Sequence, residues 1–245
     1  GGKTKMKISR VSNCEIELDH DTLTLEFRGR ERERRHAKTY ARCVMAQRTG
    51  SVVIDEADVA DNCTSVLVPK EAVGPVMGRG GQLLRAIEDE NNVVMMFADF
   101  EGEDRDKNEA ERLVIWGERR GRRNAQLAAM KVAEEKDPDY YSRQWRESGE
   151  LFQEKSDLLS DWGTVVVELK EEELAWVLGK KGSTRKKVAK ASGCILHYIG
   201  ILAFMSGTKK QREKCKEYLG WLLQQLDDRE GHTFDVSTER DDCTV

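Results

Sequence analysis

The chain has 245 residues, of which 38% are hydrophobic and 35% are charged, and its formal net charge is −4. This polar composition favours several small domains over one large domain, because small domains expose more surface per residue. The negative charge excludes a protein that coats nucleic acid through bulk electrostatics, so such binding would need local basic patches. The sequence has no apolar run long enough for a membrane span, so we expect no membrane partner.

The N-terminal segment, residues 1–48, starts with Gly1-Gly2-Lys3 and continues in a helical pattern. Two strands are expected next, the second over Thr22–Arg28, and a basic amphipathic helix follows Gly29. The sequence has neither an initiator Met nor a signal-peptide core, so we expect it to be a piece of a longer protein. Because a first helix and a first strand are missing, nothing in this segment covers the apolar side chains of its strands. We therefore expect the isolated segment to be unstable. These uncovered side chains are Ile16, Leu18, Leu23 and Leu25.

The middle module, residues 63–136, is organised around the loop Gly78-Arg79-Gly80-Gly81, which separates two short helical patterns. A strand precedes them, two strands follow, and a long amphipathic helix completes the order β-α-loop-α-β-β-α. Glycine has no Cβ and tolerates positive φ, so this loop could approach a phosphate chain closely.

The charges around this loop are mixed. Arg79 and Arg85 would attract phosphate, and we expect them to face the acidic residues Glu88, Asp89 and Glu90. The acidic loop 99–107 between the two following strands would repel phosphate. The sequence therefore leaves two alternatives open, a weak or specialised nucleic-acid binder and a module kept for packing.

The third module, residues 163–226, repeats this arrangement around Gly179-Lys180-Lys181-Gly182. The loop and the helix after it carry no acid, and the N–H groups of a helix N-terminus favour anions. The following stretch Cys194–Leu196 would supply a strand edge and an apolar floor for bases. We favour nucleic-acid contact here over a solvated charge run. The cations are Lys180, Lys181, Arg185, Lys186, Lys187 and Lys190.

The three segments align without gaps after Gly2, Gly81 and Gly182. The alignment interprets Gly1-Gly2 as the second half of a further Gly-x-x-Gly loop. Asp241–Val245 also resembles the start of the middle module. We therefore expect the chain to be a piece of a longer array of tandem modules. The predicted divisions are 1–48, the C-terminal part of one module; 49–62, a connector; 63–136, a complete module; 137–162, an aromatic and acidic connector; 163–226, a complete module; and 227–245, a connector and the start of a further module.

The connectors and basic runs have less specific patterns. The connector 137–162 is rich in aromatic residues, which favours packing on a neighbour over a free tether, with a helix around Ser148–Ser160. The stretch Arg48–Ile54 is expected to pack as a short extended element. The arginine runs Arg28–Arg35 and Arg119–Arg123 are interpreted as solvated helix faces, and a phosphate-binding or protein-docking face is the alternative.

The remaining reactive residues do not form a catalytic or metal site in the sequence. The six cysteines contain no C-x-x-C pair, which favours reduced thiols in the cytoplasm or nucleus over a disulfide framework. The four histidines are dispersed and have no further ligand at metal-binding spacing. We therefore predict no catalytic residue, no metal, no cofactor and no enzymatic activity.

The stretch Val73-Gly-Pro-Val-Met-Gly-Arg-Gly-Gly81 resembles the Ile-Gly-x-x-Ile-Gly-x-x-Gly pattern of the KH domain of eukaryotic type. The third module departs from it, since Ala175 replaces the first glycine and Arg185 takes a place that is usually apolar. The resemblance implies an α+β fold of tandem KH modules, each a three-stranded antiparallel sheet backed by three helices, as in vigilin-type arrays. In such modules the loop clamps about four nucleotides.

This resemblance implies two alternative functions. One is binding of single-stranded RNA, or of single-stranded DNA, which the lysine-rich third module supports. The other is a structural, protein-docking role in a ribonucleoprotein or another assembly, which the net negative charge supports. We favour RNA binding. The implied nucleic-acid-binding residues are Gly179, Lys180, Lys181, Gly182, Arg185, Lys186, Gly78, Arg79, Gly80, Gly81, Arg85, Gly1, Gly2 and Lys3.

Overall fold

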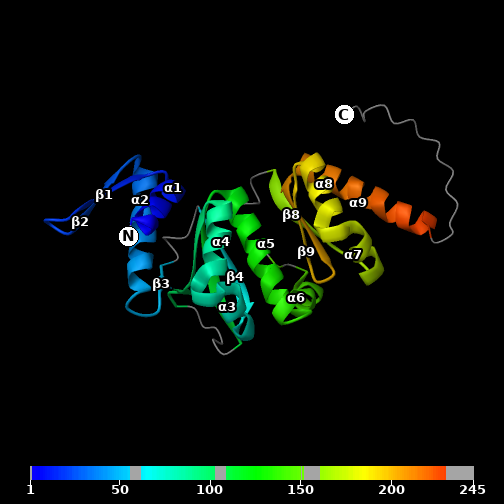
Figure 1. Ribbon diagram of the computed structural model, residues 1–245, viewed down its shortest axis with the longest axis horizontal. Coiled ribbons are helices and arrows are strands. Elements are labelled where there is room, and N and C mark those ends of the chain that lie inside the picture. Colours follow the sequence, from blue (N-terminus) through cyan, green and yellow to red (C-terminus); the bar gives the residue numbers. More distant parts are fainter. Residues whose placement is uncertain (1, 56–61, 103–108, 150, 152–160, 230–245) are drawn as a thin grey trace. The chain divides into compact units, whose positions relative to one another are not determined.

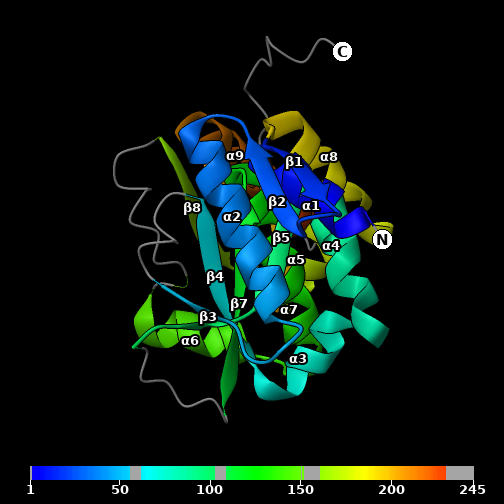
Figure 2. The same ribbon diagram turned by 90° about the vertical axis from the view of Figure 1, so that its left-hand side faces the viewer.

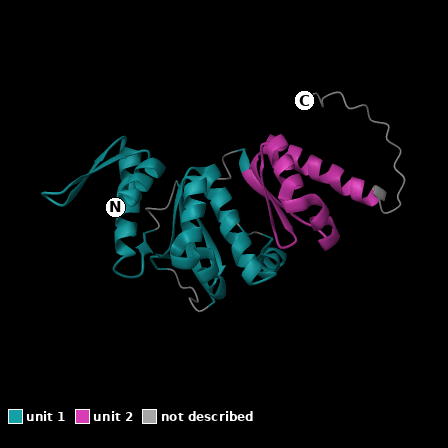
Figure 3. Cartoon of the chain, in the orientation of Figure 1, with its two compact units in different colours: residues 1–162 teal, residues 163–245 magenta. Residues whose placement is uncertain are grey.

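The computed structural model shows an α+β chain (Figure 1). It describes residues 2–55, 62–102, 109–149, 151 and 161–229. The residues form two compact units, 1–162 and 163–245, which are taken one at a time below (Figure 3). The repeat expected at Asp241–Val245 lies outside the described residues, as does nearly all of the helix expected around Ser148–Ser160.

The N-terminal segment consists of helix α1 (Lys3–Ser12), strands β1 (Glu15–Asp19) and β2 (Thr24–Arg28), and helix α2 (Glu31–Ala46). The two strands form an antiparallel hairpin with Ile16 opposite Phe27. Helix α1 ends because Asn13 adopts the left-handed conformation, with φ at 55°, which turns the chain into β1.

The middle module has the predicted order of elements: β4 (Cys63–Pro69), α3 (Lys70–Met77), α4 (Gln82–Asn91), β5 (Val93–Phe97), β7 (Ala110–Gly117) and α5 (Arg119–Lys136). Its strands form an antiparallel sheet in the order β4-β7-β5, so β5 is an edge strand beside α4. Asn92 at the end of α4 repeats the left-handed turn of Asn13, with φ at 53°.

The N-terminal segment packs on this sheet. Helix α2 lies on the face turned away from α3, α4 and α5 (Figure 1 and Figure 2). Tyr40 on α2 is buried, and its ring centre lies 5.6 Å from that of Trp116 on β7. The expected uncovered face is therefore covered in part, since Ile16 is buried while Leu23 is 80% exposed. One core cluster joins the two parts: Ile8, Cys14, Ile16, Ala37, Tyr40, Ala41, Cys43, Val52, Ile54, Val94, Met96, Ala98, Val114 and Trp116.

Both connectors of this unit are anchored. Strand β3 (Val53–Ile54) pairs in parallel with β6 (Asp99–Phe100), which confirms the short extended element. Helix α6 (Tyr140–Ser148) places Tyr141 in the core, where its hydroxyl donates to the carbonyl oxygen of Leu67 at 2.9 Å. The first part of the aromatic connector is thus packed, as expected.

The interpretation of Arg119–Arg123 as a solvated face is wrong for two of its residues. Arg122 is 5% exposed and Arg123 is 1% exposed. The Arg122 guanidinium donates through Nε to Thr64 Oγ1 at 3.0 Å and through Nη1 to the Gly117 oxygen at 2.6 Å. These donors fix the start of α5 to the sheet, because a buried guanidinium needs acceptors for its N–H groups.

The second unit contains β8 (Trp162–Glu168), α7 (Glu171–Leu178), α8 (Ser183–Ser192), β9 (Ile195–Ile199), β10 (Leu202–Thr208) and α9 (Lys209–Arg229). The sheet order β8-β10-β9 corresponds to β4-β7-β5, strand by strand. Gly193 ends α8 with φ at 70°, at the position of Asn13 and Asn92. The two modules therefore share one topology.

Candidate nucleic-acid interface

The two Gly-x-x-Gly loops have nearly the same backbone. Gly78 and Gly179 open them with φ/ψ of 70°/173° and 67°/172°. The final glycines, Gly81 and Gly182, have φ of 76° and 72°, and each donates its N–H to the oxygen of the first glycine at 3.0 Å. Each loop leads directly into the N-terminus of a helix.

The first glycine of each loop is required by space as well as by φ. A Cβ on Gly78 would lie 2.6 Å from the Cβ of Leu83, and one on Gly179 would lie 2.1 Å from Thr184 Oγ1. The third loop position differs, since Gly80 and Lys181 hold the same left-handed φ of 56° and 54°. A non-glycine residue in this conformation costs about 1–2 kcal/mol. The third module accepts this strain at an exposed lysine of its loop.

The loop of the third module presents an unscreened cluster of cations. Lys180, Lys181 and Lys186 are exposed, and none of them forms an ion pair with any of the residues that the structure describes. Arg185 is half-buried and donates from Nη1 to the Leu196 oxygen at 2.7 Å, which places its guanidinium at β9. Arg185 is therefore tolerated at a position that is usually apolar, because its guanidinium donates to the carbonyl oxygen of Leu196.

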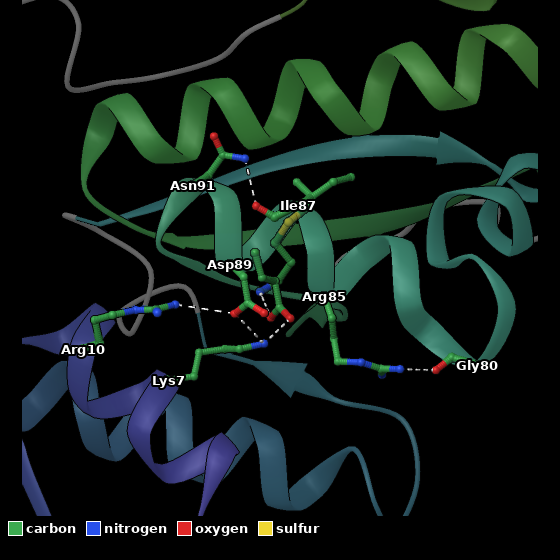
Figure 4. Close-up of polar contacts among 9 residues, drawn as sticks. Lys7, Arg10, Gly80, Arg85, Ile87, Asp89 and Asn91 are labelled. Atoms are coloured by element: carbon green, nitrogen blue, oxygen red, sulfur yellow. Dashed lines mark hydrogen bonds and ion pairs between the residues drawn. The ribbon is translucent and has the colours of Figure 1, made fainter.

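The loop of the middle module has different neighbours. Arg79 is exposed, and Arg85 donates from Nη2 to the Gly80 oxygen at 2.5 Å (Figure 4). The expectation that Arg79 and Arg85 face the acids of α4 is wrong for Glu88 and Asp89, because both carboxylates pair with the N-terminal segment. Lys7 Nζ lies 2.5 Å from Glu88 Oε2, and Arg10 Nη2 lies 3.5 Å from Asp89 Oδ1 (Figure 4).

The basic pattern of the N-terminal segment indicates Lys7 and Arg10, with Lys3 and Lys5, as part of a nucleic-acid site. Sequence reasoning missed the pairing of Lys7 and Arg10 with α4. Both lie in a segment that the repeat assigns to a preceding module, and nothing in the local pattern links that segment to α4. The opposite charges of the Lys7–Arg10 stretch and the Glu88–Glu90 stretch are the only signal that could have suggested the contact.

The interpretation of Gly1-Gly2 as half of a loop is not reproduced at Gly2. This residue has φ/ψ of −69°/−3°, and its carbonyl oxygen accepts from Met6 N–H at 3.0 Å. Gly2 therefore belongs to the first turn of α1 and lacks the left-handed backbone of Gly81 and Gly182. Lys3 is exposed on the same turn, and Gly1 lies outside the described residues.

Cys14 and Cys63 lack the environment of a nucleophile. The cysteines within the described part of the chain, Cys14, Cys43, Cys63, Cys194 and Cys215, are free thiols. Burial raises the pKa of the Cys63 thiol to about 12 and also raises the pKa of Cys14, so both remain protonated at neutral pH. Over the described ranges there is no cluster of three metal-ligating side chains, and no helix is long and apolar enough to cross a membrane.

Comparison with known proteins identifies the middle module. The family model of the KH domain matches residues 63–131. Those residues are a KH domain, which is a class of RNA-binding domain. No curated protein matches the chain.

Three solved structures with some likeness to the chain come from archaea. They include an a/eIF2alpha–aDim2p–rRNA complex from Pyrococcus horikoshii OT3 (16% identity, 69% of this chain and 93% of that chain covered, TM-score 0.35). Dim2p alone from the same organism gives 16% identity, 69% and 100% coverage and a TM-score of 0.35. A protein of unknown function from Aeropyrum pernix is 16% identical, with 69% of this chain and 94% of that chain covered and a TM-score of 0.28. The assignment of the KH domain does not depend on these structures, because their TM-scores are below 0.5.

Proposed function

We propose that the chain binds single-stranded RNA through two successive KH modules, residues 63–136 and 163–226, whose Gly-x-x-Gly loops hold the phosphate backbone. The third module supplies most of the affinity. The N-terminal segment and residues 227–245 are parts of neighbouring modules in a vigilin-like tandem array, with residues 49–62 and 137–162 as connectors. Linked weak sites combine through their effective concentration, so two modest modules suffice for useful affinity.

The observation that carries this proposal is the loop of the third module. Its backbone has the geometry of the loop in the KH domain of residues 63–131, and it presents Lys180 and Lys181 to solvent. The N–H groups at the start of α8 add a partial positive charge at the same place. Phosphate is the ligand that satisfies both features.

A structural role is the second candidate, and a specific contact favours it. The N-terminal segment already covers one face of the middle sheet and pairs its cations with α4. In this alternative the modules mainly contact protein in a ribonucleoprotein or another assembly, and the net charge of −4 agrees with it.

The test is binding of a random single-stranded RNA pool at several salt concentrations, with single-stranded DNA of the same length as competitor. Lys180→Asp/Lys181→Asp is expected to weaken binding at least about tenfold and to reduce the salt slope by roughly 1.4, at about 0.7 per lost phosphate contact. The matched control is Lys209→Asp/Lys210→Asp, an equal charge change on exposed lysines at the start of α9. Absence of binding by the folded wild type would support the structural role instead.

A further inference from the structure

The edge of the middle sheet is closed at Met95. Strand β5 is an edge strand, and the outward N–H groups of such a strand are open to another strand or a ligand. The Met95 N–H instead donates to Glu88 Oε1 at 2.9 Å. Since Glu88 lies on the helix that follows the glycine loop, its carboxylate occupies the strand edge next to the expected RNA path.

The N-terminal segment holds this carboxylate in place. Lys7 Nζ contacts the second oxygen, Oε2, and the two side chains are 18% and 8% exposed. Ile8, the next residue on α1, is part of the shared core with the middle sheet, so the position of Lys7 is fixed by packing as well as by charge. Glu88 therefore has a partner for each oxygen, as a nearly buried carboxylate requires.

The corresponding edge of the third module has the opposite character. Aligning Gly81 with Gly182 places Ala189 at the position of Glu88 and Leu196 at the position of Met95. Helix α8 contains no acidic residue. At Leu196 it is the carbonyl oxygen that is engaged, by a donor from Arg185. One module thus presents a carboxylate at this edge and the other a guanidinium.

We infer that Glu88 removes base readout from the middle module, so that this module grips phosphate through its loop while the third module selects the sequence. The inference rests on the proposed function. Base edges carry the sequence information of single-stranded RNA, whereas phosphate contacts only position it. A base that approaches Met95 finds its N–H already used, and the carboxylate repels the phosphate that would follow.

The experiment uses the full chain with Lys180→Asp/Lys181→Asp, so that the middle module dominates the remaining binding. Glu88→Ala, which installs the residue of the third module, is expected to raise affinity for the random RNA pool at least about fivefold, the worth of roughly one hydrogen bond. Selection from the pool is expected to enrich a base at one position. The matched control is Asp89→Ala, which removes the same charge from a side chain that is 62% exposed and is expected to give less than a twofold gain.

Equal gains from Glu88→Ala and Asp89→Ala, or no gain and no enriched base with Glu88→Ala, would overturn the inference. Faster hydrogen exchange at the Met95 amide checks that the edge has opened. If thermal unfolding shows that Glu88→Ala does not fold, Glu88→Gln is measured in its place. Glutamine keeps an acceptor for the Met95 N–H, so its gain in RNA affinity should be no larger than that of Asp89→Ala. A larger gain with Glu88→Gln would overturn the inference. If the proposed function itself is wrong, the wild-type chain will show no RNA binding that depends on the loop lysines and on salt. That result is distinct from the outcomes that test Glu88.

Discussion

The middle and third modules share a topology and a loop backbone but differ in what surrounds the loop. The middle loop carries Arg79 and three glycines, and the helix after it ends in acids that pair with the N-terminal segment. The third loop carries two exposed lysines and a helix without acids. Under the proposed function, the Gly-x-x-Gly loop sets where a phosphate lies, and the charges of the next helix decide how strongly that phosphate is attracted.

The middle module also uses the two faces of its sheet differently. Its outer face carries the N-terminal segment, which is joined to it by Tyr40 and Trp116. Under the proposed function, contacts with protein and with nucleic acid would use different parts of this module, the sheet face for protein and the loop for nucleic acid.

The largest effect is expected from Tyr40→Ala, which breaks the contact that sets the middle module apart. Tyr40 is buried against Trp116, and its hydroxyl accepts a hydrogen bond from Asn62 Nδ2. Loss of a buried aromatic ring should reduce the free energy of unfolding of the first unit by about 3–5 kcal/mol in a urea titration.

Tyr40→Phe is the control for Tyr40→Ala. It keeps the ring and loses the hydroxyl, with an expected cost of roughly 1 kcal/mol. A change below that value for Tyr40→Ala would show that the N-terminal segment is not held by this core.

Next in size is the cost of a side chain at the first loop glycine. Gly78→Ala and Gly179→Ala should each reduce the free energy of unfolding by about 1–3 kcal/mol, because both the positive φ and the near contacts oppose a Cβ. Gly80→Ala is the matched control, since open space surrounds its Cβ position. Its cost should be only about 1 kcal/mol. Equal losses at all three glycines would mean that φ alone matters.

The order of elements could be predicted from the sequence because it depends on local patterns. Helical periodicity, strand alternation and the Asn13, Asn92 and Gly193 turns recur at aligned positions, and all three turn residues have the left-handed φ that ends a helix. The loop glycines were found for the same reason, since their spacing is short and repeated.

The residues that could not be predicted depend on contacts between distant parts of the chain. Arg122 belongs to an arginine run typical of a solvated helix, yet it is buried because Thr64 and Gly117 supply acceptors from the sheet. Likewise Glu88 was expected to face Arg79 and Arg85, and its partner is Lys7, 81 positions away. Charge patterns within a helix do not show which distant helix supplies the opposite charge.

A smaller effect is expected when the loops are made alike. Gly80→Lys gives the middle module the residue of Lys181, which has the same φ. The stability loss should be about 1 kcal/mol, and affinity for the RNA pool should rise about two- to threefold at low salt, since one cation is added beside the phosphate path. Gly80→Gln, of similar length but neutral, is the control. A gain of the same size with glutamine would exclude a phosphate contact.

The smallest effect concerns Glu134, which fixes the connector helix α6 to the middle module. Its two oxygens accept from Asp139 N–H at 3.1 Å and from Tyr141 N–H at 3.0 Å. Burial nevertheless raises the pKa of Glu134 above its ordinary value of 4.5, and these hydrogen bonds oppose that shift only in part. The folded state therefore binds the proton more readily than the unfolded state does.

The sign of the pH effect follows from this raised pKa. The penalty on ionised Glu134 is complete above its folded-state pKa, and it is relieved as the pH falls from there toward 4.5. When the pH is lowered from 7 to 5, the free energy of unfolding of the wild type, measured by urea titration, should rise relative to that of Glu134→Gln by less than about 1 kcal/mol. Glu135→Gln, on an exposed neighbour, is the control. If both variants changed equally with pH, the anchoring carboxylate of α6 would not be the source, and the attachment of the connector would depend on Tyr141 alone.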